Sequence, residues 1–239
     1  MTFKYMTVTG ADDDTNIRGM IELSKEYNFL EWGLLFPLLG HPRFPSLEWF
    51  KQLREEVKQK DVKLNLSAHL CFDMLDSALA NKLAEDYLKG FNRVQLNFHG
   101  IDHFWLKDEL EPLFKFIETN ANRKIIFQFD GVNDKWILEY LDINKYPNIQ
   151  YLFDTSSGAG ILPNTFPMPY SGVTCGFAGG LGPDNLKDVV TTFKETLNPT
   201  KSFWIDMETR VRTKGKFDLN KVAQCAEIVA KTVWGRHPI

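Results

Sequence analysis

The sequence has few cysteines and no long apolar run. Its three cysteines, Cys71, Cys175 and Cys225, cannot all pair, and no spacing among them suits a zinc site. A membrane-spanning helix needs about 20 consecutive apolar residues, and no stretch approaches that length. These absences argue against a disulfide framework and a membrane span, and they predict reduced thiols in a reducing compartment.

An excess of positive charge is also missing. The chain carries 28 Lys and Arg against 31 Asp and Glu, a formal net charge of −3, and no basic cluster is dense enough for a polyanion. We therefore expect no nucleic-acid partner. The segment from Met1 to Gly10 lacks the apolar core of a signal peptide and is typical of a strand. Together these features predict a cytoplasmic protein without a membrane partner.

What the chain does contain is ordinary globular material. Apolar residues make up 44% and charged residues 25% of the 239 residues, enough apolar material for a large core. A barrel of eight strand–helix units needs roughly 250 residues. The length therefore suits a single barrel domain that spans residues 1–239.

Short apolar runs alternate with amphipathic stretches from end to end. The runs predict strands at Tyr5–Thr9, Leu30–Phe36, Lys63–His69, Arg93–Phe98, Lys124–Phe129, Ile149–Phe153, Gly172–Ala178 and Ser202–Met207. Apolar residues at helical spacing predict helices at about 15–28, 47–60, 78–90, 104–121, 133–142, 184–197 and 218–233. Ser46 and Asp218 are suited to cap the helices that follow them.

This alternation favours parallel strands, because each parallel crossover needs a covering helix. The even repeats without a linker favour closure into a (β/α)8 barrel, with an open doubly wound sheet as the rival. One segment, Ser156–Tyr170, has no periodicity and is rich in proline and glycine. We expect a long loop there, with the sixth helix replaced or irregular.

Polar residues follow the predicted strands, at the end of a barrel where active sites form. Burying so many polar groups unpaired is costly, so they need water, one another or a ligand. The candidates, in chain order, are Thr9, Asp12, Asp13, Asp14, Arg43, His69, His99, Asp130, Asp154, Gly179, Gly180, Glu208, Thr209 and Arg210.

Several of these strand ends are similar to those of one family in order and spacing, with two residues inserted in the strand-four run. The run from Val94 reads Val-Gln-Leu-Asn-Phe-His-Gly, the run from Leu152 reads Leu-Phe-Asp-Thr, and the run from Phe177 reads Phe-Ala-Gly-Gly-Leu-Gly-Pro-Asp-Asn. With His41-Pro42-Arg43, the chain resembles phosphoribosylanthranilate isomerase, a (β/α)8 enzyme of tryptophan biosynthesis. The family's runs are Val-Gln-Leu-His-Gly, Leu-Leu-Asp-Thr, Leu-Ala-Gly-Gly-Leu-x-Pro-Glu-Asn and Ser-Pro-Arg.

The resemblance implies an Amadori rearrangement, in which a phosphoribosyl ring opens to an aminoketose with the help of a general acid and a general base. The family's acid corresponds to Asp154. Its base, a cysteine that ends strand one, corresponds to Thr9, whose hydroxyl has no accessible anionic form near neutral pH. Another group is then the base, or the reaction differs. Candidates for that role are His69, Asp12, Asp130 and Glu208.

The resemblance also implies a phosphate site built from backbone N–H groups. Gly179 and Gly180 keep the strand-seven half, and glycine lets a backbone approach an anion closely. The family's strand-eight Ser-Ser-Gly has become Glu208-Thr209-Arg210. Thr209 and Arg210 can donate to a phosphate, whereas Glu208 repels it unless paired with Arg210, Arg212 or a metal. Further substrate contacts are expected from Thr9, Arg43 and His99.

Each feature also has a structural interpretation. Gly179-Gly180 is a suitable tight turn, Asp130 suits an Asx turn, and the run Asp12–Asp14 suits a solvated helix cap. Strand-end histidines are often structural, and Glu208 is suited to an ion pair with Arg210 or Arg212.

We conclude that the sequence predicts an isomerase that acts on a phosphorylated, sugar-like small molecule by acid–base chemistry, without a cofactor. One alternative is a metal-dependent sugar isomerase, epimerase or lyase that uses Glu208, His69 and Asp130. Another is a non-catalytic ligand-binding barrel. The substrate, the identity of the base, the oligomeric state and the pathway stay open.

Overall fold

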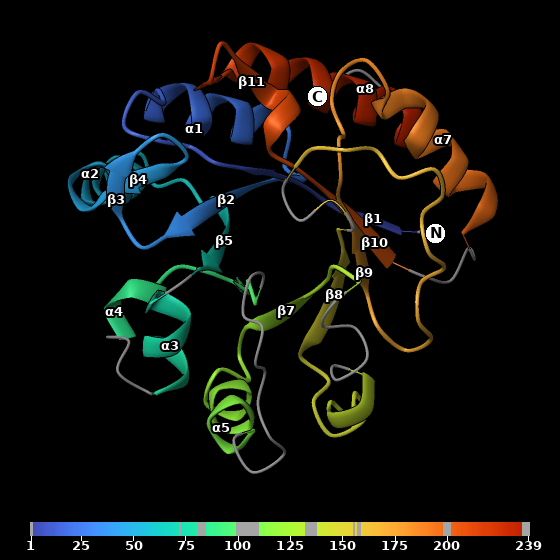
Figure 1. The fold of residues 1–239 in the computed structure, drawn as a ribbon. Helices are drawn as coiled ribbons and strands as arrows, with labels where there is room; N and C mark the ends of the chain where they lie inside the picture. Colours follow the sequence, from blue (N-terminus) through green and yellow to red (C-terminus); the bar gives the residue numbers. More distant parts are fainter. Residues whose placement is uncertain are drawn as a thin grey trace.

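The computed structural model describes residues 2–71, 73–80, 85–98, 110–131, 138–154, 156, 159–197 and 202–235. Its main strands are β1 (Thr2–Thr9), β2 (Leu30–Phe36), β5 (Asn65–Leu70), β6 (Arg93–Leu96), β7 (Lys124–Phe129), β8 (Ile149–Phe153), β9 (Cys175–Phe177) and β10 (Ser202–Met207). They close into a parallel barrel in the order β1-β10-β9-β8-β7-β6-β5-β2 (Figure 1). The predicted (β/α)8 barrel is confirmed, and the open sheet is wrong.

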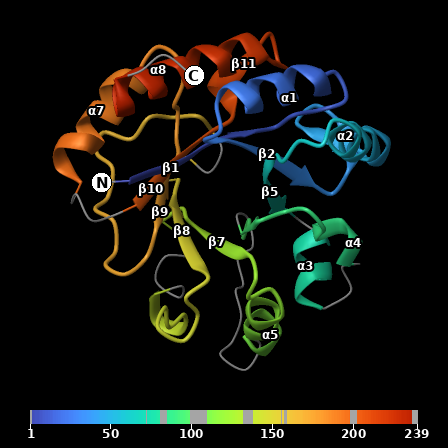
Figure 2. The ribbon, with the colours of Figure 1, turned by 180° about the vertical axis from the view of Figure 1, so that it is seen from behind.

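Helices surround the barrel, as the view from behind also shows (Figure 2). They are α1 (Ile17–Glu26), α2 (Leu47–Gln59), α3 (Asp73–Leu79), α4 (Glu85–Leu88), α5 (Glu111–Thr119), α7 (Leu186–Thr196) and α8 (Leu219–Trp234). The predicted caps are confirmed: Ser46 accepts from Trp49 N, and Asp218 accepts from Asn220 N. Within these described ranges, no helix combines the length and apolar character of a membrane span.

Some predicted bounds are wrong. The helix expected at 78–90 begins earlier, as α3, because Leu75 is already part of its buried face, and the structure describes α4 within the expected range, with residues 81–84 outside the described ones. Of the strand expected at Gly172–Ala178, only β9 pairs, since Gly172 adopts φ 79° in a turn. Parts of the helices expected at 104–121 and 133–142 lie outside the described residues.

The chain between β8 and β9 contains no helix in its described residues, 154, 156 and 159–174, as predicted for this segment. A hairpin that the sequence did not predict follows β2: β3 (Leu39–His41) pairs with β4 (Phe44–Ser46). Its turn holds Arg43 at φ 77°. The hairpin therefore fixes the backbone from which the Arg43 side chain leaves.

The main apolar core lies between the sheet and the helices. On β10, Phe203 and Ile205 belong to this outer cluster. Trp204, between them, belongs to a small inner cluster with Leu152 and Ala178. Because alternate residues of a strand point to opposite faces, β10 contributes one set of side chains to the outer core and the other to the barrel axis.

Below the carboxyl ends of the strands, the barrel axis is filled by a buried polar layer, which we define as Thr7, Glu31, Arg93 and Gln150. Arg93 Nη1 contacts Glu31 Oε1 at 2.6 Å, and both side chains are almost fully buried. Thr7 Oγ1 donates to the same Glu31 oxygen at 2.8 Å, and Arg93 Nε donates to Gln150 Oε1 at 3.1 Å. The Arg93 guanidinium also lies 4.1 Å from the centroid of the Trp204 ring. This layer closes the barrel below the site.

Candidate functional site

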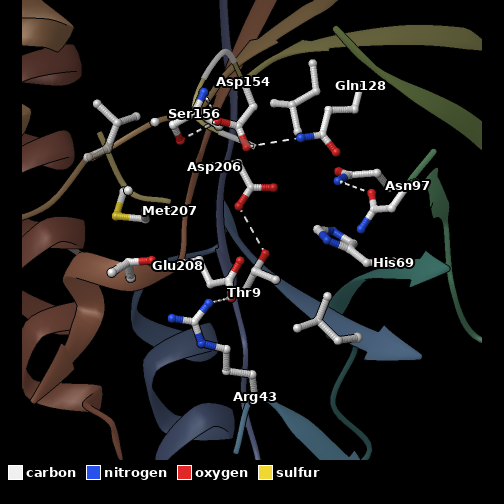
Figure 3. A pocket seen from close by; sticks show the side chains of 18 of the residues that line it. Thr9, Arg43, His69, Asn97, Gln128, Asp154, Ser156, Asp206, Met207 and Glu208 are labelled. Carbon is white, nitrogen blue, oxygen red and sulfur yellow. Dashed lines mark hydrogen bonds and ion pairs between the residues drawn. The ribbon is translucent and has the colours of Figure 1, made fainter. Parts of the chain in front are cut away.

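A cavity of about 300 Å³ opens at the carboxyl ends of the strands (Figure 3). All eight barrel strands, or the loops that follow them, contribute to its lining. A volume of this size suits a small molecule. Many of the predicted site residues line it together: Thr9, Arg43, His69, Asp154, Gly179, Gly180, Glu208, Thr209 and Arg210.

Two of the proposed bases do not line this cavity. Asp12 is buried beside it, where Arg212 Nη2 contacts its Oδ2 at 2.7 Å and Thr15 Oγ1 donates to its Oδ1 at 3.2 Å. Asp12 therefore fixes the turn after β1, and neither the base nor the solvated-cap interpretation fits it. Asp130 is buried at the end of β7 and is also absent from the lining. His99 lies outside the described residues.

Asp154 follows β8 and reaches into the cavity. Ser156 N and Oγ donate to Oδ1 at 3.1 and 2.8 Å, and Gln128 Nε2 donates to Oδ2 at 3.1 Å (Figure 3). These donors hold the Asp154 carboxyl group in place at the cavity.

Asp206 is a second carboxyl group in the same cavity, and the sequence analysis did not select it. It lies within β10 and is only 6% exposed. Thr9 Oγ1 donates to its Oδ1 at 3.0 Å. Burial raises the pKa of Asp206 well above its ordinary value, and the Glu208 and Glu31 carboxylates raise it further against the opposing effect of Thr9 and Arg93.

Glu208 pairs with Arg43, not with Arg210 or Arg212 as the sequence predicted. Arg43 Nη1 contacts Glu208 Oε1 at 2.7 Å. The prediction was wrong because the β3–β4 hairpin brings Arg43 over β1, while Arg212 is engaged by Asp12. Burial raises the pKa of Glu208, although the nearby Arg43 and Arg212 charges lower it. Because the Arg43 charge is compensated, Arg43 is a weaker anion anchor than expected.

His69 lies inside β5, one residue before the strand ends, and forms part of the cavity floor. It is 2% exposed, and burial, with the Arg93 charge, lowers its pKa to about 3. The ring is therefore neutral at physiological pH. Its Nε2 has no hydrogen-bond partner among the described residues. His69 thus contributes a neutral ring to the cavity floor, with its Nε2 buried beside Gly33.

Cys71 is not suited to the role of the cysteine that the sequence resemblance implies at the position of Thr9. Burial raises the pKa of the Cys71 thiol to about 11. Asn97 Nδ2 donates to its sulfur at 3.1 Å. Cys71 lines the cavity as a neutral thiol.

Gly33 lets two floor residues approach each other across β2. A Cβ on Gly33 would lie 2.2 Å from Thr9 Oγ1 and 3.0 Å from His69 Nε2. We predict that Gly33→Ala lowers the free energy of unfolding by roughly 1–3 kcal/mol, because this floor has no room for a methyl group. Urea unfolding measures the loss. In a Thr9→Ala background the same substitution should cost less, and an equal cost in both backgrounds would contradict the predicted clash.

The Gly179-Gly180 turn adopts φ values of 107° and 59°. A Cβ on Gly180 would lie 2.5 Å from Leu162 N, so glycine is also needed for the close passage of the chain's own loop. Asn185 Nδ2 donates to Gly180 O at 2.8 Å, which ties this turn to the start of α7. The two glycines therefore form the tight turn that the structural interpretation predicts. This turn is compatible with anion binding by their N–H groups.

Arg210 is the free cation of the cavity rim in the part of the chain that the structure describes. Its side chain packs on Gly182, where a Cβ would lie 2.6 Å from Arg210 Cβ. Arg210 is exposed and makes no ion pair or hydrogen bond with any described residue. It is therefore available to an anionic ligand.

Several lining residues escaped the sequence analysis because they lie within strands or in short polar runs. The signal that marks them is a polar side chain at every second position, as in Gln95 and Asn97 or Asp206 and Glu208. The missed polar lining consists of Gln95, Asn97, Gln128, Ser156 and Asp206.

The side chains proposed for a metal centre are not assembled as one. Asp130 does not line the cavity, and Glu208 is paired with Arg43. Among the described residues, no group of three His, Cys, Asp or Glu side chains is arranged to hold a metal ion. The described geometry therefore does not favour the set Glu208, His69 and Asp130 as metal ligands.

No protein-family model matches this chain, and no curated protein matches it. N-(5'-phosphoribosyl)anthranilate isomerase from Pyrococcus furiosus is structurally similar, with a TM-score of 0.55 at 12% sequence identity over 95% of this chain and 99% of that chain. A sugar phosphate isomerase/epimerase from Parabacteroides distasonis ATCC 8503 has a TM-score of 0.52 at 12% identity over 95% of this chain and 98% of that one. At this identity, the similarity shows the barrel fold alone.

Proposed function

We propose that this protein is an isomerase that transfers protons within a small, phosphorylated, sugar-like molecule. The observation that carries the proposal is Asp154, a carboxyl group held by donors on Ser156 and Gln128 in a cavity of about 300 Å³. We assign it the proton-accepting role, whereas the sequence resemblance implies a general acid at this position. General acid–base catalysis needs such a positioned group within reach of the substrate.

The anionic end of the substrate binds at the rim between Arg210 and the Gly179-Gly180 turn. The Arg210 guanidinium has no partner among the described residues, and the glycine turn precedes the N-terminus of α7. An unpaired guanidinium and a helix N-terminus both favour a phosphate group. Arg43 contributes less to binding of the anionic end, because its charge is offset by Glu208.

The uncharged end of the substrate binds in the interior of the cavity. Gln95, Asn97 and the neutral ring of His69 line this part. Amide and imidazole groups both donate and accept hydrogen bonds, so they suit hydroxyl groups of a sugar.

The names of the similar structures suggest which molecules to test first. One is an N-(5'-phosphoribosyl)anthranilate isomerase, and the other is a sugar phosphate isomerase/epimerase. The purified full-length protein should be assayed with phosphoribosylanthranilate, followed by its fluorescence, and with aldose and ketose phosphates, followed by NMR in D2O. We expect turnover of at least one, with deuterium incorporated at the carbon that exchanges its proton.

Two outcomes would favour the alternatives. Binding of these phosphates without proton exchange or turnover would indicate a non-catalytic binding barrel. Turnover that is lost with a chelator and restored by a divalent cation would indicate the metal-dependent reaction. Turnover that is unaffected by the chelator supports the present proposal.

Arg210→Ala is expected to raise KM for the phosphorylated substrate by roughly 10- to 100-fold, the value of a hydrogen bond to a charged group. Its kcat should stay near that of the wild type, because the phosphate contact is the same in the ground state and the transition state. Steady-state kinetics measure both constants. Arg18→Ala, on the exposed face of α1, is the control. An Arg210 variant with unchanged KM would place the phosphate elsewhere.

A further inference from the structure

The cavity contains a carboxyl group that the reaction proposed above does not yet use. Asp206 lies on the inner face of β10, two positions after Trp204 and two before Glu208. This alternation sets it on the cavity floor, above the buried polar layer. Its place is therefore fixed by the barrel itself and does not depend on a loop.

The strand between those of Asp206 and Asp154 presents small residues to the barrel axis. The strands of these two aspartates, β10 and β8, are the two neighbours of β9. Gly176 of β9 faces the barrel axis, and Ala178 and Gly180, which come directly after β9, continue this row of small residues. Figure 3 shows the side chains of Asp154 and Asp206 in the same part of the cavity.

One oxygen of Asp206 is engaged and the other faces the cavity. Thr9 Oγ1 donates to Oδ1 at 3.0 Å, and no described residue donates to Oδ2. The second oxygen points away from Thr9 into the pocket (Figure 3). Thr9, at the position of the related family's catalytic cysteine, thus orients a carboxyl group instead of reacting itself.

We propose that Asp206 is the second catalytic residue, which gives a proton to the substrate while Asp154 takes one; this rests on the isomerase function proposed above. To give a proton, the Asp206 carboxyl group must be protonated, and its surroundings favour that form. The groups facing it are the neutral His69 ring, the carboxylates of Glu31 and Glu208, and the Arg93 guanidinium that Glu31 already neutralises. Burial among these groups raises the pKa of Asp206.

For an aminoaldose phosphate, the protons balance over the cycle. The Asp206 acid protonates the ring oxygen as the bond from that oxygen to C1 breaks, and the Asp154 carboxylate removes the proton from C2, which leaves an enol with a C1–C2 double bond. The enol hydroxyl then returns its proton to Asp206, and Asp154 delivers its proton to C1. The product is the 1-amino-2-ketose, and both carboxyl groups recover their starting forms.

The test is Asp206→Asn, which keeps an oxygen for Thr9 but cannot give up a proton. On a substrate that the wild type turns over, we expect kcat to fall by roughly 10²-fold or more. The loss of activity at high pH, which reports the acid that must be protonated, should disappear, while the low-pH limb stays. Asp188→Asn, an exposed position on α7, is the matched control. Thermal unfolding shows whether the variant is folded.

Thr9→Val provides a second route if Asp206→Asn does not fold. The Thr9 hydrogen bond lowers the pKa of Asp206, so its removal should move the high-pH limb to higher pH. Wild-type turnover combined with kinetics of Asp206→Asn like those of Asp188→Asn would overturn the role of Asp206 and leave the isomerase proposal intact. An unmoved limb in Thr9→Val would overturn it as well. Absence of turnover by the wild type would overturn both proposals.

Discussion

Asp154→Asn is expected to lower kcat for the isomerisation by roughly 10²- to 10⁴-fold, the usual contribution of a positioned acid–base group. An asparagine fills the same space and can still accept from Ser156, but it cannot take a proton from carbon. Substrate affinity should change little, since the proposed phosphate site is formed by Arg210 and the Gly179-Gly180 turn and not by Asp154. Single-turnover kinetics and direct binding measurements separate the two effects.

The interpretation of that variant depends on a matched comparison. Gln128 Nε2 donates to Asp154 Oδ2. In Asp154→Asn the new side-chain NH2 group can take the place of Oδ2, and two donors then face each other unless the Gln128 amide rotates to present its oxygen. Gln128→Ala therefore reports the orientation effect alone, and we expect it to cost far less than Asp154→Asn. Equal losses in the two variants would mean that Asp154 only shapes the cavity.

Arg93→Met is expected to lower the free energy of unfolding by about 3–5 kcal/mol, because it leaves the buried Glu31 carboxylate without its counter-charge. Arg93 and Glu31 lie 2.6 Å apart, with 2% and 1% of their side chains exposed. Gln150 also loses the Arg93 hydrogen bond. Chemical denaturation at neutral pH measures the change.

The double variant Glu31→Leu/Arg93→Met is the control for this prediction. When both charges are absent, no ion is left unpaired, so most of the lost stability should return. Lys25→Met, which removes a cation from the exposed pair with Glu22, should change stability by less than about 1 kcal/mol. An Arg93→Met variant as stable as the wild type would mean that the buried charge is compensated in another way.

The barrel could be predicted because its signal is repeated in every unit. Apolar strands such as Leu30–Phe36 and Ile149–Phe153 keep their predicted bounds, since burial on both faces leaves a mostly apolar run, interrupted in each by the polar residue of the buried layer, Glu31 or Gln150. The end of each strand then identified Asp154 and Glu208 as cavity residues. Strand ends meet at one mouth in this fold, so sequence order was sufficient for them.

Loop residues were harder to place, because a loop has no period that fixes the direction of its side chains. Asp12 and Arg43 both follow strands, yet one turns to Arg212 beside the cavity and the other crosses to Glu208. Asp206 was missed for a different reason. It lies inside an apolar strand, and only the two-residue alternation shows that it faces the axis.

The separation between the outer apolar shell and the polar interior affects which amino-acid substitutions this protein can tolerate. Residues such as Phe203 and Ile205, which pack helices against the sheet, do not line the cavity. Most of the side chains that line the cavity lie outside that shell, and Leu181 and Met207 belong to both. Amino-acid substitutions among the cavity residues can therefore change ligand specificity while the barrel keeps most of its stability.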